Sequence, residues 1–163
     1  MTHDADLDLA KIAIQESVLI FQEFDNDTAL ALGLALREAA LALGAGVVID
    51  IRRNDDCLFF LAMPGTTNAN GDWARRKRNL TNLVQRSSYA MNLEFDRGFD
   101  AVAFMGLNPR DYVPAGGCFP IKVAGAGMIG TVTISGLPSR DDHKLASDTI
   151  AAFLNINLGE AAF

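Results

Sequence analysis

The fold is decided by CFPIKVAGAGMIGTVTIS, residues 118–135 of the 163-residue chain. Residues 118–123 and 129–135 are rich in β-branched and apolar side chains, a composition typical of strands. Gly125-Ala126-Gly127 lies between them, and it favours a tight hairpin because glycine readily adopts the positive φ that such turns need. A hairpin joins antiparallel neighbours, so this stretch predicts an antiparallel strand pair.

The same glycines also fit a GxGxxG fingerprint, in Gly125-Ala126-Gly127-Met128-Ile129-Gly130. In a dinucleotide site this loop must open a helix, whose N-terminal N–H groups hold the phosphates. Here residues 131–134 follow, β-branched throughout, and they indicate a strand. We therefore prefer the hairpin to a dinucleotide-binding loop.

Working outward, a second hairpin is predicted from strands at 47–52 and 57–63 with a polar turn at 53–56, and a single strand at 18–24. Helices are expected at residues 7–16, 26–43, 73–95 and 139–154. Asp25, Asp72 and the capping-box pattern of Ser139 and Asp142 are the expected starts of the last three helices.

One strand followed by two hairpins predicts a five-stranded, mainly antiparallel sheet, with helices available for both faces. We expect an α/β (α+β) fold, a three-layer α/β/α sandwich. The whole chain, 1–163, is expected to form one domain, with an N-terminal helical arm at 1–17, a core at 18–156 and a frayed tail at 157–163.

Composition excludes several functional classes. The formal net charge of −6 argues against a general nucleic-acid or anionic-membrane partner, and no apolar run approaches the ~20 residues of a spanning helix. Met1 to Asp8 carry acids and no basic region, so we expect no signal peptide and a cytoplasmic location.

The soft metal ligands are few. Cys57 and Cys118 are the two cysteines, typical of a reducing compartment, and no CxxC or HxxxH spacing occurs. His3, on an end expected to fray, and His143 are the two histidines. We therefore expect no metal site.

The predicted helix 73–95 carries the main candidate site. At 100° per residue its apolar stripe includes Trp73, Leu80 and Met91. Arg76, Lys77, Ser87 and Ser88 fall within or beside that stripe, whereas Arg75 and Arg78 point away from it. A core-facing cation needs an anion. Either the two cations reach solvent or Asp50, or they line a basic, hydroxyl-bearing cleft for an anionic ligand.

Other residues have both structural and functional interpretations. Asp50, in mid-strand, needs a partner such as Arg76 or Lys77, or a residue across the sheet beside Arg52; a general-base role has no second carboxylate to support it. Gly116 and Gly117 either form a turn or let backbone approach a ligand or another chain.

The last candidates are His143 and a row of hydroxyls. His143 is either a packed residue on the stripe of its helix or an axial heme ligand. Thr131, Thr133 and Ser135 share one strand face, expected to meet solvent or a polar subunit interface. No GxSxG elbow occurs and neither cysteine has a base nearby in sequence, so no catalytic constellation is visible and enzymatic activity stays open.

Two motifs together resemble a known family. Residues 116–121, Gly-Gly-Cys-Phe-Pro-Ile, and residues 127–136 resemble the pattern GG-x-x-P-I … G-x-x-G-x-x-x-x-S-G of the heme-degrading-domain family, the GlcG/HbpS-like proteins. Residues 73–79 with 86–89 are similar to a branch of short, uncharacterised cytosolic members. The resemblance runs from about Asp25 to Leu154. It implies a profilin-like fold, homo-oligomeric assembly and, in some relatives, heme binding.

These observations lead to one main hypothesis and two alternatives. The main one is a non-catalytic, oligomeric binding protein with a small anionic ligand, such as a tetrapyrrole propionate, near Arg76, Lys77, Ser87 and Ser88. An enzyme acting on heme or a small organic acid, through Asp50 or His143, is the first alternative. A protein-interaction scaffold is the second. No cofactor follows from the residues themselves, and heme is the candidate that the resemblance implies.

Overall fold

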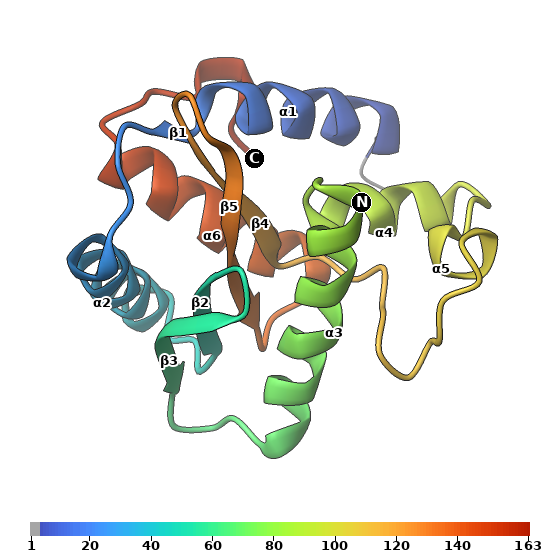
Figure 1. The fold of residues 1–163 in the computed structure, drawn as a ribbon, viewed down its shortest axis with the longest axis horizontal. Coiled ribbons are helices and arrows are strands. Elements are labelled where there is room, and N and C mark those ends of the chain that lie inside the picture. The colour runs from blue at the N-terminus through green and yellow to red at the C-terminus, as the bar shows by residue number, and fades with distance from the viewer. Residues whose placement is uncertain (1–3) are drawn as a thin grey trace.

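A computed structural model describes residues 4–163, so the expected fraying at His3 lies outside the described residues. Helices and strands are interspersed along the chain, with β2–β3 and β4–β5 as consecutive strand pairs (Figure 1). In chain order they are α1 (Ala5–Val18), β1 (Ile20–Phe21), α2 (Asn26–Ala42), β2 (Val48–Arg53), β3 (Asp56–Ala62), α3 (Asn68–Val84), α4 (Ser88–Asp96), α5 (Ala101–Phe104), β4 (Cys118–Val123), β5 (Gly127–Ser135), α6 (Ser139–Phe153) and the 3-10 turn η1 (Gly159–Ala161).

The five strands form one sheet in the order β1-β4-β5-β2-β3. The pairs β4–β5, β5–β2 and β2–β3 are antiparallel, and the two-residue β1 pairs with β4 in parallel. The predicted turn between β4 and β5 is present, with φ of 77° at Gly125 and 75° at Gly127. This arrangement confirms the predicted mainly antiparallel α/β fold.

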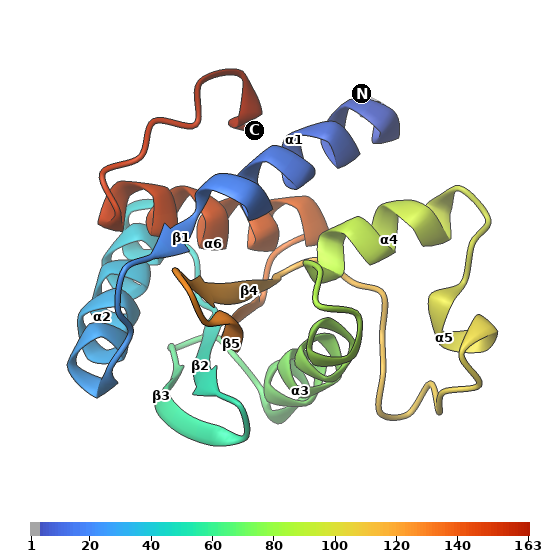
Figure 2. The same cartoon turned by 45° about the horizontal axis from the view of Figure 1, so that its top comes forward.

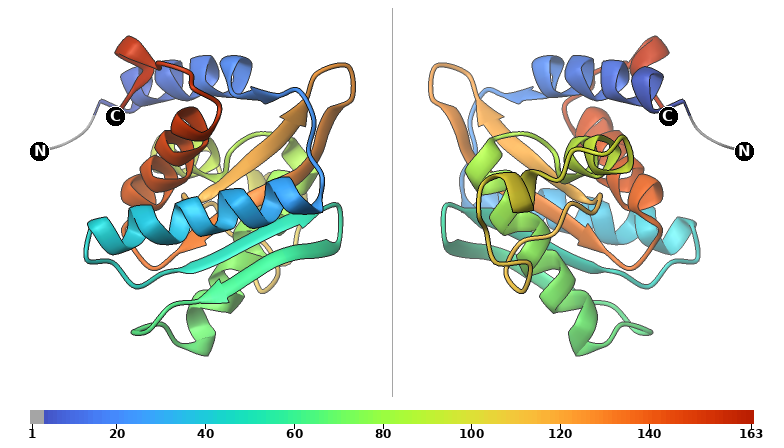
Figure 3. Two further views of the ribbon diagram at one scale, coloured as in Figure 1. Left: turned by 90° about the vertical axis from the view of Figure 1, so that its left-hand side faces the viewer. Right: turned by 90° about the vertical axis from the view of Figure 1, so that its right-hand side faces the viewer.

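Helices cover both faces of the sheet. Figure 3 shows α2 and α6 on one face and α3 on the other. Alternation along β2 and β5 explains the two interfaces, because Ile49 and Val132 join the core under α2 and α6, whereas Asp50 and Thr133 face α3. The sheet therefore has one apolar face and one largely polar face, and α3 packs on the polar one.

The long helix predicted at 73–95 is wrong in two respects. It begins earlier, at Asn68, where the Thr67 backbone N–H donates to the Asn70 side chain at 2.8 Å, so Asp72 is not the cap. It also ends at Val84, because Gln85 adopts a left-handed conformation with φ of 57°. The side chain of Ser87 then caps a separate helix, α4.

The chain ends also differ from expectation. Strand 18–24 shrinks to two residues because α1 runs on to Val18. The tail expected to fray instead packs along α1, where Gln15 Nε2 donates to the Ala161 carbonyl and Lys11 Nζ to the Ala162 carbonyl, each at 2.7 Å. Figure 2 shows α1 and the C-terminal segment side by side above α6. Within residues 4–163, no helix combines the length and apolarity needed to cross a bilayer.

Candidate functional site

A groove lies on the α3 side of the molecule, around Trp73. It consists of two hollows of about 350 and 320 Å³ that share Trp73, Ala115 and Ser139 in their walls. Arg76 lines the first hollow and Lys77 the second. We call this feature the Trp73 groove. Trp73 itself, predicted on an apolar stripe, is 41% exposed and forms the ridge between the two hollows.

Arg76 is held over the indole of Trp73. Its guanidinium carbon lies 4.7 Å from the Trp73 ring centroid, in cation–π range. Nη2 donates to the Pro109 carbonyl at 2.8 Å, and Nε is buried without a hydrogen-bond partner. No carboxylate among residues 4–163 forms an ion pair with it. Arg76 therefore has no ion-pair partner within the described chain.

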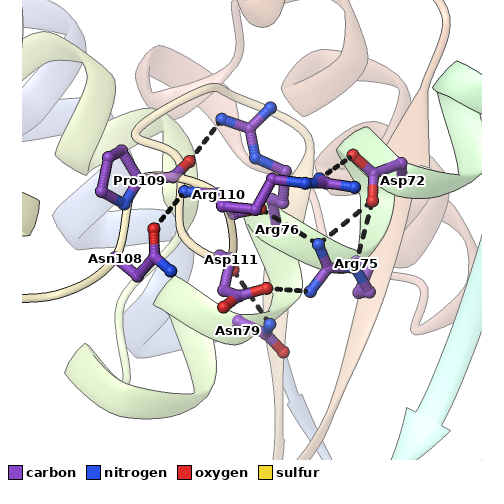
Figure 4. A network of polar contacts seen from close by, with 8 residues as sticks. All are labelled: Asp72, Arg75, Arg76, Asn79, Asn108, Pro109, Arg110 and Asp111. Carbon is purple, nitrogen blue, oxygen red and sulfur yellow. Dashed lines mark hydrogen bonds and ion pairs between the residues drawn. The ribbon is translucent and has the colours of Figure 1, made fainter.

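The neighbouring arginines are neutralised by Asp72 of α3 and by Asp111 of the loop that walls the groove (Figure 4). Arg75 pairs with Asp72 at 3.1 Å and with Asp111 at 2.9 Å, and Arg110 pairs with Asp72 at 2.9 Å. The hydrogen bonds that Asp72 accepts from Arg110 and Arg75 lower the pKa of Asp72. The hydrogen bonds that Arg75 donates to Asp111 and Asp72 raise the pKa of Arg75. This network fastens the loop at 108–111 to α3.

Lys77 already has an anion inside the protein. The side chain is 4% exposed, and Nζ lies 2.9 Å from Asp142 Oδ2 and 3.1 Å from the Ile134 carbonyl. Asp142 also accepts from the Leu137 backbone N–H at 2.9 Å. Burial raises the pKa of Asp142, an effect that the Lys77 ammonium opposes. The sequence predicts that Asp142 caps its helix. Its carboxylate instead pairs with Lys77 and accepts the backbone N–H groups of Gly136 and Leu137, which precede the helix.

The glycine pair lets the chain approach its own sheet. Gly117 has φ of 133°, and a Cβ there would lie 2.2 Å from the Ile134 carbonyl and 2.9 Å from Lys77 Nζ. The Gly116 N–H donates to Ser139 Oγ at 3.0 Å, and a Cβ at Gly116 would meet the Ser139 carbonyl at 2.3 Å. Both glycines are buried behind the groove lining, where Gly117 approaches Lys77 and Gly116 approaches Ser139.

Asp50 lies away from the groove, on the sheet face under α3. It pairs with Arg52 at 3.0 Å and with Arg78, so the expected pairing with Arg76 or Lys77 is wrong. Successive residues of a helix point about 100° apart, and this rotation from Lys77 directs Arg78 to β2. The hydroxyls of Thr131 and Thr133 are buried on the same face, so they do not meet solvent or a subunit interface.

The two serines join elements rather than line the groove. The Ser87 N–H donates to Glu16 Oε1 at 2.6 Å, which ties α1 to the start of α4. Ser88 Oγ accepts the Cys118 N–H at 2.9 Å, which ties α4 to β4. Both are fully buried, because the break at Gln85 turns this segment into the protein.

His143 is sealed in an aromatic cluster. It has no exposed surface, its Nε2 lies 2.8 Å from Gln15 Oε1, and the rings of Tyr89, Phe119 and Phe163 surround it. Burial lowers its pKa to about 3, so the ring is neutral. It does not line the Trp73 groove.

The structure thus brings together Arg76, Lys77, Gly116 and Gly117 and separates them from the other predicted site residues. Sequence reasoning missed two acids of the groove, Asp96 and Asp100, which line the same hollow as Arg76. It also missed Asp142, although a lysine turned inward demands an acid. The segment bracketed by Pro109 and Pro114 was the one sequence signal for the wall loop.

Fold and groove together define the class, a small α/β domain with a five-stranded, mainly antiparallel sheet and a ligand-sized groove beside its main polar-face helix. The model of the family described as "Haem degrading protein HbpS-like" matches residues 24–151. The chain belongs to this HbpS-like family, which confirms the resemblance found in the sequence.

Similar proteins extend beyond the family match. A UPF0303 protein of Azotobacter vinelandii is 47% identical over 158 residues, 96% of this chain and 95% of that protein. The crystal structure of Ybr137w protein has a TM-score of 0.82 and 26% identity, covering 90% of this chain and 87% of that one. A PduOC:heme complex has a TM-score of 0.66 at 21% identity, covering 82% and 95%, and supports the fold alone.

The donor set of the groove does not fit axial heme ligation by histidine, cysteine or methionine. The described residues that line it contain none of the three. His143 is sealed elsewhere, Cys118 is buried, and the exposed Cys57 lies on β3. Among groups that bind metals in proteins, the groove offers Tyr112, Lys77 and carboxylates. Its chemistry is that of charge and hydrogen bonding.

Proposed function

We propose that this protein is a non-catalytic, self-associating binding protein whose Trp73 groove takes a small carboxylate ligand. The observation that carries the proposal is the guanidinium of Arg76, which has no ion-pair partner among the described residues and is held over the partly exposed indole of Trp73. The other cations at the groove, Arg75, Arg110 and Lys77, have acidic partners. An anion that enters the groove therefore has its most favourable electrostatic interaction with Arg76.

The chemistry of the groove selects among anions. A guanidinium carries five N–H donors, and Arg76 uses one of them on the Pro109 carbonyl. A carboxylate at the others would form charge-assisted bonds, and a flat apolar body would contact the indole. Asp96 and Asp100 line the same hollow and repel further negative charge, so a ligand with one carboxylate end and a neutral body suits the site.

Heme enters this proposal only as one carboxylate ligand among others. The PduOC structure contains heme, and the family description refers to heme degradation. In the present chain a propionate would meet Arg76, without a histidine, cysteine or methionine on the metal. We therefore expect no histidine-type spectrum from hemin, and His143→Ala is not expected to change the spectrum.

Fluorescence offers a direct test, because Trp73 is the only tryptophan. We expect benzoate, as the probe, to change Trp73 emission saturably. Arg76→Gln should weaken binding roughly tenfold or more, since a hydrogen bond to a charged group contributes about 1.5–3 kcal/mol. Arg86→Gln, which removes the same charge from the α3–α4 connection outside the groove lining, is the matched control.

Two results would contradict the proposal. One is the absence of saturable binding for benzoate and for hemin alike. The other is an equal loss of affinity in Arg76→Gln and Arg86→Gln, which would mean that the net charge of the protein, rather than the groove, attracts the anion. A hemin Soret shift that disappears in His143→Ala would instead place the ligand at the aromatic cluster.

A further inference from the structure

The outer surface of α2 carries a row of leucines that nothing in the described chain covers. Leu30, Leu34 and Leu41 are 50%, 49% and 48% exposed, and Arg37 lies between the last two. We call these four residues the α2 seam. Its spacing of four, three and four residues is the a/d spacing of paired helices. The opposite face of α2 is fully used, since Leu32 and Leu36 are buried against the sheet.

The structure assigns the α2 seam a partner: we propose that it pairs with the α2 seam of a second copy of this chain, antiparallel, around a two-fold axis near Arg37 and Glu38. In this arrangement Leu34 of each copy lies level with Leu41 of the other. The inference rests on the self-association included in the proposed function and names the surface responsible for it.

Charge complementarity decides both the partner and the direction. Within one copy Arg37 Nη1 lies 2.5 Å from Glu38 Oε1, an exposed pair between sequence neighbours that adds little stability. The two-fold antiparallel arrangement places each Arg37 opposite the other copy's Glu38, twice per dimer, and opposes the helix dipoles. A parallel arrangement would set Arg37 against Arg37.

The α2 seam occupies one face of a single helix. A 17-residue helix is about 26 Å long, too narrow alone for the ~800 Å² per partner of a standard interface. The groove of about 800 Å³ between α2 and α6 does not widen the seam, because Ala35, Ala39 and Ala42 lie on the other flank of the helix, roughly 135° from the seam at 100° per residue. We therefore expect a weak dimer, in equilibrium with monomer at micromolar concentration.

A charge-exchange experiment tests the seam by sedimentation velocity. We expect Arg37→Glu, which sets two glutamates against each other, to raise the dimer dissociation constant at least tenfold. The double exchange Arg37→Glu with Glu38→Arg should restore it, because the pairs re-form with opposite signs. Leu34→Glu should dissociate the dimer, whereas Leu83→Glu, on an equally exposed leucine of α3, should not. Circular dichroism checks that each variant is folded.

The outcomes separate this inference from the rest of the proposed function. If the wild type self-associates but Arg37→Glu and Leu34→Glu have no effect, the seam is the wrong surface and self-association stands. A wild type that is monomeric at high micromolar concentration overturns both the seam and self-association. Benzoate binding to Trp73, measured on the same samples, reports on the groove independently.

Discussion

The Lys77–Asp142 pair shows how single residues connect the layers of this fold. Lys77 lies on α3 and Asp142 on α6, on opposite faces of the sheet, and they meet past the end of the central strand β5 with both side chains at most 5% exposed. Removing one partner of such a buried pair leaves an uncompensated charge, which costs more than the pair itself contributes. The pair therefore holds the groove floor in place more than it attracts a ligand.

Replacing Lys77 by Met should consequently destabilise the protein by about 3 kcal/mol or more. The double variant Lys77→Met with Asp142→Asn should lose less, because the buried charge has gone. Lys144→Met removes a half-exposed ion pair with Asp148 and a hydrogen bond to the Phe163 carbonyl, and should cost about 1 kcal/mol. Urea unfolding measures all three. If Lys77→Met lowered the free energy of unfolding no more than Lys144→Met, the buried pair would contribute little to stability.

At the scale of elements, the break between α3 and α4 shapes the site. Had the helix continued through Gln85, as its composition predicts, Ser87 and Ser88 would lie along the groove. The left-handed residue instead turns the chain, and the two serines anchor α4 to α1 and β4. Local helix propensity favours a continuous helix through Gln85, whereas burial of α4 in the protein favours the turn. Burial contributes more than propensity to the stability of a helix in a folded protein, so the turn forms.

This break predicts an unusual effect of glycine. Because left-handed backbone costs a non-glycine residue about 1 kcal/mol, Gln85→Gly should stabilise the protein by up to that amount. In a continuous helix the same change would destabilise it by about 1 kcal/mol. Gln85→Ala serves as the control for loss of the side chain, with little change expected. Thermal unfolding measures whether Gln85→Gly raises or lowers stability. A lower stability would contradict a left-handed residue between α3 and α4.

At the scale of the whole molecule, the two chain ends close over His143. Gln15 comes from α1, Phe163 from the C-terminus, and the histidine from α6. Asp8 and Arg140, which pair at 3.0 Å, are the charged groups near it. The cluster therefore joins segments on both sides of the family match at 24–151.

Acid should weaken this closure. The pKa of His143 is about 3 in the folded protein and about 6.5 when unfolded, so between these values the unfolded state binds the extra proton. The neutral ring therefore contributes its full share of the folding stability above about pH 6.5, and this contribution is lost as the pH falls towards 3. When the pH is lowered from about 7 to about 5, the free energy of unfolding of the wild type should decrease by about 2 kcal/mol more than that of His143→Gln. Urea titrations at both pH values test this, and parallel losses in the two proteins would contradict it.

The sequence by itself determined the elements whose causes are local. Both hairpins, the long α2 with its Asp25 cap and the mainly antiparallel sheet follow from strand composition, turn glycines and helix spacing over a few residues. The family resemblance likewise came from short motifs in order along the chain.

Only the tertiary structure decided which side chains meet. Lys77 finds Asp142 across 65 residues, Gln15 finds His143 across 128, and Arg78 rather than its neighbours reaches Asp50. Arg76 keeps its charge free because the loop at 108–111 supplies Asp111 to Arg75 and only a carbonyl to Arg76. Such choices depend on how layers pack in space, and a buried charge pairs with whichever acid the packing brings within reach.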